Sequence, residues 1–128
     1  MKKILMIGTG GTIASGQSVQ GLTPELSTRQ LLEFVPGISD FCEVTCTQLF
    51  SLDSTNMHPA HYLRLVRAIR ESYEAYDGFV ICHGTDTMAY TAAALSYLIQ
   101  GSRKPIVLTG AQKPISFDST QAPIPSTA

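Results

Sequence analysis

Residues 78–88 read GFVICHGTDTM, an apolar run followed by a glycine-containing polar turn and then by residues that favour a helix. The apolar part, 78–82, has the pattern of a strand that is covered on both faces. A helix is expected at 88–99, with Thr87 as its cap. A strand, a polar turn and a helix in this order are typical of α/β proteins, which bind ligands at such turns.

The same order of a strand and a polar turn is repeated along the chain. The other predicted strands are 3–7, 41–52 and 105–109, and the other predicted helices are 27–35 and 59–73. Alternating strands and helices predict an α/β fold, a mostly parallel sheet with helices on both faces. All four polar turns then lie at the carboxyl edge of one sheet. Residues 15–21 are polar and lack periodicity, so we expect a mobile loop there that serves as a lid.

The composition indicates one globular domain. The chain has 128 residues, of which 44% are hydrophobic and 15% charged. A net charge of −1 gives no basic surface for nucleic acid, and no apolar stretch approaches the roughly 20 residues that cross a membrane. No secretory signal is recognisable, which favours the cytoplasm. The three cysteines form no paired pattern, so we expect reduced, buried thiols.

The glycine-rich turn at 8–13, GTGGTI, has three interpretations. A dinucleotide fingerprint needs a small residue at its sixth position, where this chain has Ile13. A purely structural turn is the second interpretation. The third is a reactive threonine beside backbone N–H groups that glycine leaves free to bind an oxyanion.

Threonine and histidine residues near the turns need a similar comparison. Thr85 becomes a nucleophile only when a base accepts its proton, and Lys113 is the only lysine near a turn in the second half. His83 is either a base or a buried histidine at a strand end, and we favour the second. His58 and His61 have a spacing that could hold a metal, but no third ligand matches, so we predict no metal.

Four segments of the chain resemble the bacterial-type L-asparaginases, in particular their cytoplasmic type I branch. They are TGGTIA at 9–14, DSTNM at 53–57, HGTDTM at 83–88 and TGAQKP at 109–114. The similarity runs from about Lys3 to Asp118. It implies a Rossmann- or flavodoxin-like N-terminal domain at 1–118. The remaining residues, 119–128, contain two prolines and no periodicity and depart from the family, so we expect a poorly ordered or foreign tail there.

The resemblance also implies roles for individual residues. Thr12 would attack the side-chain amide of L-asparagine, forming an aspartyl ester and releasing ammonia, and water would then free L-aspartate. Thr85 and Asp86 would complete the catalytic set, and the substrate would be bound by Asp53, Ser54, Thr85, Asp86 and Ala111. No cofactor is implied, and the expected assembly is a homo-oligomer, either a dimer or a tetramer.

The chain departs from this family in three ways. The family enzymes are much longer, and their catalytic lysine lies beyond the point where this chain stops. Leu22 stands where many members have a tyrosine. We therefore expect the 128-residue chain to be inactive, or nearly so, on its own. The alternatives are a non-catalytic amino-acid-binding domain and the amidase component of a tRNA-dependent amidotransferase. The second usually has an additional N-terminal domain, whereas Met1 here adjoins the first predicted strand.

Overall fold

The computed structural model of the chain describes residues 1–10, 15–18, 21–24, 37–52, 54–110 and 126–127. The predicted helix at 27–35 and the predicted site residues Thr12, Asp53 and Ala111 lie outside this part of the chain. The strands are β1 (Lys2–Gly10), β2 (Ser15–Ser18), β3 (Gly21–Pro24), β4 (Cys42–Leu52), β5 (Gly78–Cys82), β6 (Ile106–Gly110) and β7 (Ser126–Thr127). The helices are α2 (Pro59–Ser72) and α3 (Met88–Leu98), with short 3₁₀ turns η2 (Ile38–Asp40) and η3 (Ser54–Asn56).

A five-stranded sheet in the order β4-β1-β5-β6-β7 forms the centre of the molecule. The first four strands are parallel, which confirms the predicted parallel α/β sheet. β7 joins the edge by antiparallel pairing with Thr109 and Gly110 of β6. The remainder of the predicted tail lies outside the described residues.

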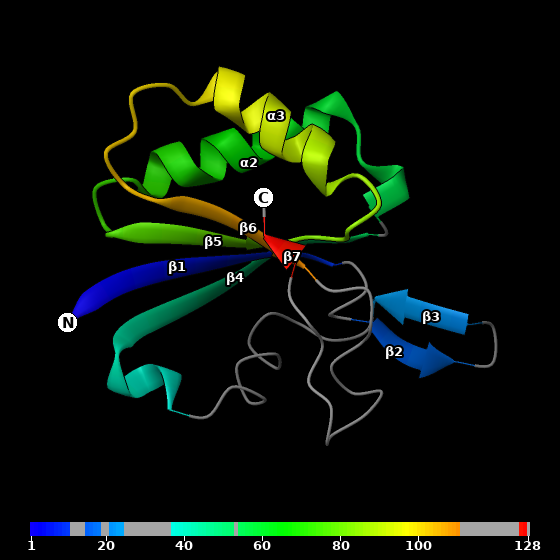
Figure 1. The fold of residues 1–128 in the computed structure, drawn as a ribbon, viewed down its shortest axis with the longest axis horizontal. Helices are drawn as coiled ribbons and strands as arrows, with labels where there is room; N and C mark the ends of the chain where they lie inside the picture. Colours follow the sequence, from blue (N-terminus) through cyan, green and yellow to red (C-terminus); the bar gives the residue numbers. More distant parts are fainter. Residues whose placement is uncertain (11–14, 19–20, 25–36, 53, 111–125, 128) are drawn as a thin grey trace.

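Helices α2 and α3 lie side by side on one face of this sheet (Figure 1). Their apolar faces pack on alternate residues of β1 and β5. The core contains Leu5, Ile7, Leu65, Ile69, Phe79, Ile81, Met88 and Leu95. The apolar stripe predicted for 59–73 is confirmed at its centre, because Leu65, Val66 and Ile69 are the buried residues of α2. Helices on the second face stay a prediction, because the segment expected to supply one is not among the described residues.

The expectation of an irregular loop at 15–21 is wrong for most of its length. β2 and β3 form an antiparallel hairpin in which Ser15 pairs with Pro24 and Ser18 with Gly21. The hairpin is visible beside the carboxyl edge of the main sheet (Figure 1). The prediction failed because backbone hydrogen bonds define these strands, whereas the sequence lacks the apolar alternation that marks a half-buried strand.

The N-terminus of α2 uses both histidines that the sequence offered as a metal pair. The backbone N–H of His58 donates to Nδ1 of His61 at 2.9 Å, and the two rings stack with centroids 5.4 Å apart. Pro59 begins the helix. Among the described residues, no cluster of three or more His, Cys, Asp or Glu could hold a metal. No helix in the same part of the chain is long and apolar enough to span a membrane.

All three cysteines are free, but they differ in burial. Cys82 is buried, as predicted, whereas Cys42 and Cys46 are half-buried. The latter two lie on β4, the outer strand of the main sheet, so fewer neighbours cover them.

Candidate functional site

The carboxyl ends of the parallel strands bring the predicted turns to one edge of the sheet. Gly8 of β1 pairs with Cys82 of β5, and Cys82 pairs in turn with Thr109 of β6. Because the three strands are parallel and adjacent, they end at nearly the same level. The carboxyl ends of these strands therefore lie side by side, and open α/β sheets bind ligands at this edge.

Two of the predicted site residues are described in full at this edge. Thr85 is half-buried and Asp86 is exposed, and both lie in the segment between β5 and α3. Ser54 lies in η3, directly after β4. The edge thus presents a hydroxyl and a carboxylate at the start of a helix, where the helix dipole favours negative charge.

The segment at 83–87 is held closely against β6. The backbone N–H of His83 donates to the carbonyl of Thr109 at 2.9 Å. A Cβ on Gly110 would lie only 2.2 Å from the carbonyl oxygen of His83 and 3.4 Å from the methyl group of Thr85. Only glycine allows this approach, so the residue after Thr109 helps to place Thr85.

The ring of His83 is fully buried and has a partner at both nitrogens. Nδ1 lies 2.6 Å from the carbonyl oxygen of Gly84, which can only accept, so Nδ1 carries the proton and donates. Nε2 then accepts from the hydroxyl of Thr91 at 2.8 Å. Burial lowers the pKa of His83, an effect that the bond to Gly84 partly opposes. This confirms a satisfied histidine at a strand end, which orders the turn.

Two buried threonines that support the turn were missed by the sequence analysis. Thr91 is completely buried on α3, and Thr9 of β1 is 2% exposed and donates to the carbonyl of Cys82 at 2.7 Å. The burial of Thr91 could have been predicted from the sequence, because its spacing places it on the same face of α3 as Met88 and Leu95. Thr9 had none, because its partner is 73 residues away in the sequence.

Thr87 occupies the predicted cap position of α3, but its side chain makes no capping hydrogen bond. The carbonyl of Thr87 accepts the first backbone hydrogen bonds of the helix, from the N–H groups of Tyr90 and Thr91, both at 3.1 Å. The first turn of α3 therefore starts directly after Thr85 and Asp86.

Comparison with known proteins shows the family to which the chain belongs. Residues 3–125 match the family described as Asparaginase, N-terminal. The chain belongs to this family. The match includes all four segments on which the resemblance was based, so the predicted relationship is confirmed.

Individual asparaginases agree with the family match in sequence and in fold. An L-asparaginase of Thermococcus kodakarensis is 42% identical over 109 residues, which are 84% of this chain and 33% of that protein. The structure of the thermostable L-asparaginase from the same organism superposes with a TM-score of 0.82 at 40% identity, covering 91% of this chain and 36% of its own. A structure described as a probable cytoplasmic L-asparaginase from Campylobacter jejuni gives a TM-score of 0.78 at 39% identity, covering 89% and 34%.

A component of a second class of enzyme is also similar to this chain. One component of the glutamyl-tRNA(Gln) amidotransferase of Metallosphaera sedula is 40% identical over 109 residues, covering 83% of this chain and 25% of that protein. The chain thus spans about a third of the length of the asparaginase relatives and a quarter of this amidotransferase component.

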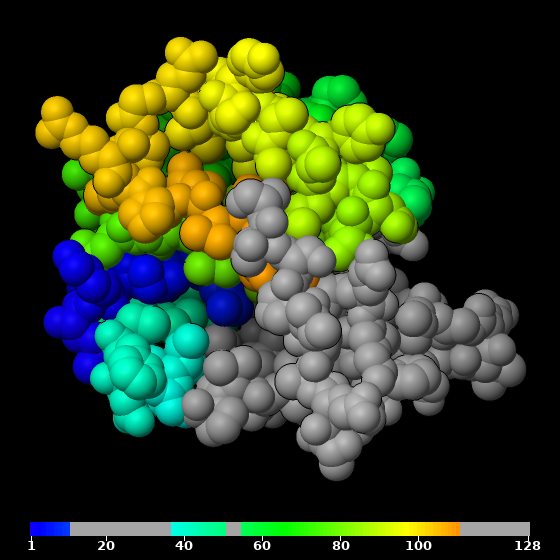
Figure 2. Space-filling model, viewed as in Figure 1, coloured from blue at the N-terminus to red at the C-terminus, as the bar shows by residue number. Residues whose placement is uncertain are grey.

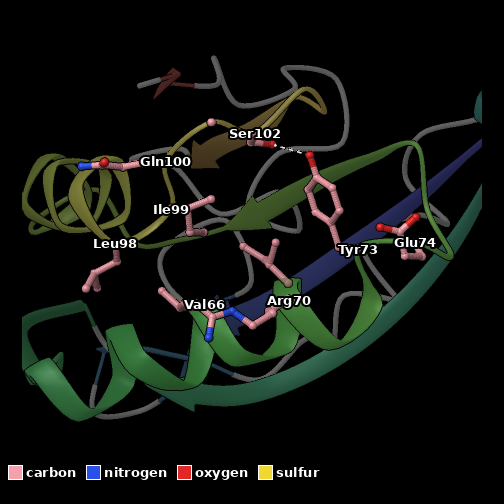
Figure 3. A pocket seen from close by; sticks show the side chains of 10 residues that line it. Val66, Arg70, Tyr73, Glu74, Leu98, Ile99, Gln100 and Ser102 are labelled. Atoms are coloured by element: carbon pink, nitrogen blue, oxygen red, sulfur yellow. Dashed lines mark hydrogen bonds between the residues drawn. The ribbon is translucent and has the colours of Figure 1, made fainter.

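A cavity of about 400 Å³ lies away from the asparaginase motifs, between the last turns of α2 and the segment that follows α3 (Figure 3). Its walls include Val66, Ile69 and Ile99, together with Arg70 and Glu74. These elements precede β5 and β6, so the cavity lies at the amino edge of the sheet. It is therefore separate from the turns that carry the motifs.

Proposed function

We propose that this chain forms the nucleophile-bearing part of an L-asparagine amidohydrolase, which converts L-asparagine and water into L-aspartate and ammonia. The observation that supports this most directly is the family match over 3–125, together with the strand pairing of β1 and β5. These two adjacent strands end next to the two motifs that contain Thr12 and Thr85. In the sequence, Thr12 follows the end of β1 by two residues and Thr85 follows the end of β5 by three.

In the proposed reaction, the hydroxyl oxygen of Thr12 attacks the carbon of the side-chain amide. The C–N bond breaks, ammonia leaves with the proton from the hydroxyl, and an aspartyl ester remains on Thr12. Water then attacks this ester and returns the hydroxyl group. N–H groups of the glycine-rich turn would stabilise the oxyanion in both steps.

Thr85 and Asp86 would assist the attack and bind the substrate. Asp86 is exposed at the edge and would bind the α-ammonium group of the substrate. The hydroxyl of Thr85 would take part in the attack, and Asp53, Ser54 and Ala111 would bind the remaining groups of asparagine. No cofactor takes part in this chemistry.

The proposal is tested by measuring ammonia release from L-asparagine together with binding of L-aspartate to the isotope-labelled chain. We expect L-aspartate to shift the amide resonances of Thr85 and Asp86 and to bind at least tenfold more weakly to Asp86→Asn. The control is Asp40→Asn, because Asp40 is exposed in η2 before β4 and far from the carboxyl edge. Ammonia release that disappears in Thr12→Ala would show that the chain alone performs the chemistry.

Two other results bear on the conclusion. Binding without ammonia release is the result expected of an N-terminal part that is inactive alone, and the amino-acid-binding alternative predicts the same result for the isolated chain. If the chain shows neither binding nor ammonia release, the proposed function is contradicted for this chain. The amidotransferase alternative is supported by the relatives of that class and predicts a preference for L-glutamine over L-asparagine in the same assay.

We also propose a homo-oligomer and a cytoplasmic location. Exposed tyrosines on the outer surface of α3, Tyr90 at 70% and Tyr97 at 78%, support the first proposal. Figure 2 shows the side chains of α3 spread over this face of the molecule. The relative from Campylobacter jejuni, described as probably cytoplasmic, supports the second. Sedimentation velocity at several protein concentrations tests the oligomer, with Tyr97→Glu expected to weaken it.

A further inference from the structure

The carboxyl end of β1 is irregular on the side that faces β4. Gly8 pairs with Gln48, but Gly10 pairs with Leu52, so the register shifts by two residues between them. On the other side, the pairing of β1 with β5 ends at Gly8 and Cys82. Thr9 thus lies at the point where the pairing with β4 changes register and the pairing with β5 ends.

The side chain of Thr9 continues the connection to β5 beyond the end of the ladder. Its hydroxyl donates to the carbonyl of Cys82 at 2.7 Å, and the residue is 2% exposed. The end of β5 is bound on its other side by the bond from the N–H of His83 to Thr109 at 2.9 Å. Of these two connections, only the one to β1 depends on a side chain.

The two residues joined by this hydrogen bond, Thr9 and Cys82, each precede a motif threonine by the same number of residues. Thr12 follows Thr9 by three residues, and Thr85 follows Cys82 by three residues. The bond therefore joins the points from which the two segments depart. The buried hydroxyl of Thr9 therefore connects the two strands at the level where both motif segments begin.

We propose that Thr9 is a positioning residue, whose hydroxyl fixes the separation of the carboxyl ends of β1 and β5, from which the two threonine motifs continue in the sequence. This inference rests on the proposed function for its catalytic meaning. The alternative is that the hydroxyl only satisfies a buried carbonyl and contributes to stability as any buried hydrogen bond does. The two possibilities differ in where the protein changes when the hydroxyl is removed.

The test compares Thr9→Val, which keeps the shape and loses the hydroxyl, with Thr9→Ser, which keeps the hydroxyl. Hydrogen exchange of backbone amides in the full chain is the first measurement. We expect Thr9→Val to raise exchange at Gly10 and at 84–86 by tenfold or more, while Leu5 and Ile81 in the core keep their rates. Thr9→Ser should stay within twofold of wild type at all of these amides.

Thr91→Val is a matched control, because it removes an equally buried hydroxyl that contacts the same turn from α3. It should raise exchange at 84–86 but leave Gly10 unchanged. A uniform rise across the core in Thr9→Val, or equal behaviour of Thr9→Val and Thr9→Ser, would overturn the positioning role.

Binding of L-aspartate is the second measurement, and it separates this inference from the proposed function. We expect Thr9→Val to weaken binding at least tenfold and Thr9→Ser to change it less than twofold. If wild type shows no binding, the proposed function fails for this chain, while the exchange rates still decide whether Thr9 fixes the two strand ends.

Discussion

Cys82 lies at the end of β5, and 5% of the surface of this residue is exposed. This burial, together with the nearby Cys46, raises the pKa of Cys82 from the ordinary value of 9.0 to about 11. The thiol therefore stays protonated in the folded chain at a pH where the unfolded chain ionises. The contribution of this protonated thiol to the free energy of unfolding is therefore fully present below pH 9 and should be lost as the pH rises towards 11.

This gives a prediction for the alkaline range. Between pH 9 and 11 the free energy of unfolding of wild type should fall by about 2–3 kcal/mol more than that of Cys82→Ala. Urea unfolding at a series of pH values measures the difference in slope. The variant Cys42→Ala, which alters a half-buried thiol, is the control. Equal slopes for wild type and Cys82→Ala would contradict the prediction.

The bond from Thr91 to His83 gives a second prediction for a single residue. Thr91→Val removes the donor and leaves Nε2 of a fully buried ring without a partner. The expected cost is about 2 kcal/mol in the free energy of unfolding, because a buried unpaired acceptor loses its hydration without compensation. Chemical denaturation measures this cost, with the exposed Thr45→Val on β4 as a control that should change stability by less than about 0.5 kcal/mol.

The close contact between the end of β6 and the residue after β5 determines how these two strands can pack. Gly110→Ala would place a methyl group 2.2 Å from the carbonyl oxygen of His83, so β6 must move away from β5. We expect a loss of about 3 kcal/mol in the free energy of unfolding. Thermal unfolding of Gly101→Ala is the comparison, because that position has open space and a φ of +73°, so only backbone strain of about 1 kcal/mol is added. Similar losses in both variants would argue against the close contact.

The elements themselves were largely predictable from the sequence, and the contacts between them were not. The apolar stripe of α2 and the continuous apolar run of β5 are local patterns, and both were located correctly. The β2–β3 hairpin was missed because its paired residues are mostly polar or glycine and lack an alternating apolar pattern. The supports of the turn, Thr9 and Gly110, act across distances of 73 and 27 residues in the sequence, which no periodicity reports.

Stability across the whole molecule should follow the order of the strands in the sheet. β1 and β5 have neighbours on both sides and contribute Ile7 and Ile81, each with no exposed surface, to the core. β4 and β7 are the outer strands. Local opening is easier where fewer buried contacts must break.

Native-state hydrogen exchange measures this order directly. We expect the slowest amides in β1 and β5, intermediate rates in β6, and rates at least a hundredfold faster than those of β1 in β7. Repeating the measurement at low protein concentration serves as the control for protection that arises from self-association. Equal protection in β7 and β1 would contradict this account.

The direction of β1 has a practical consequence for handling the protein. Met1 is 81% exposed, and the strand that follows it runs for nine residues from the amino edge to the edge with the candidate site (Figure 1). At about 3.3 Å per residue, the strand separates these two ends by roughly 26 Å. A sensor surface or a fluorescent label coupled to the N-terminus would therefore face away from the turns. Immobilisation through Met1 should leave that edge open to amino acids in solution.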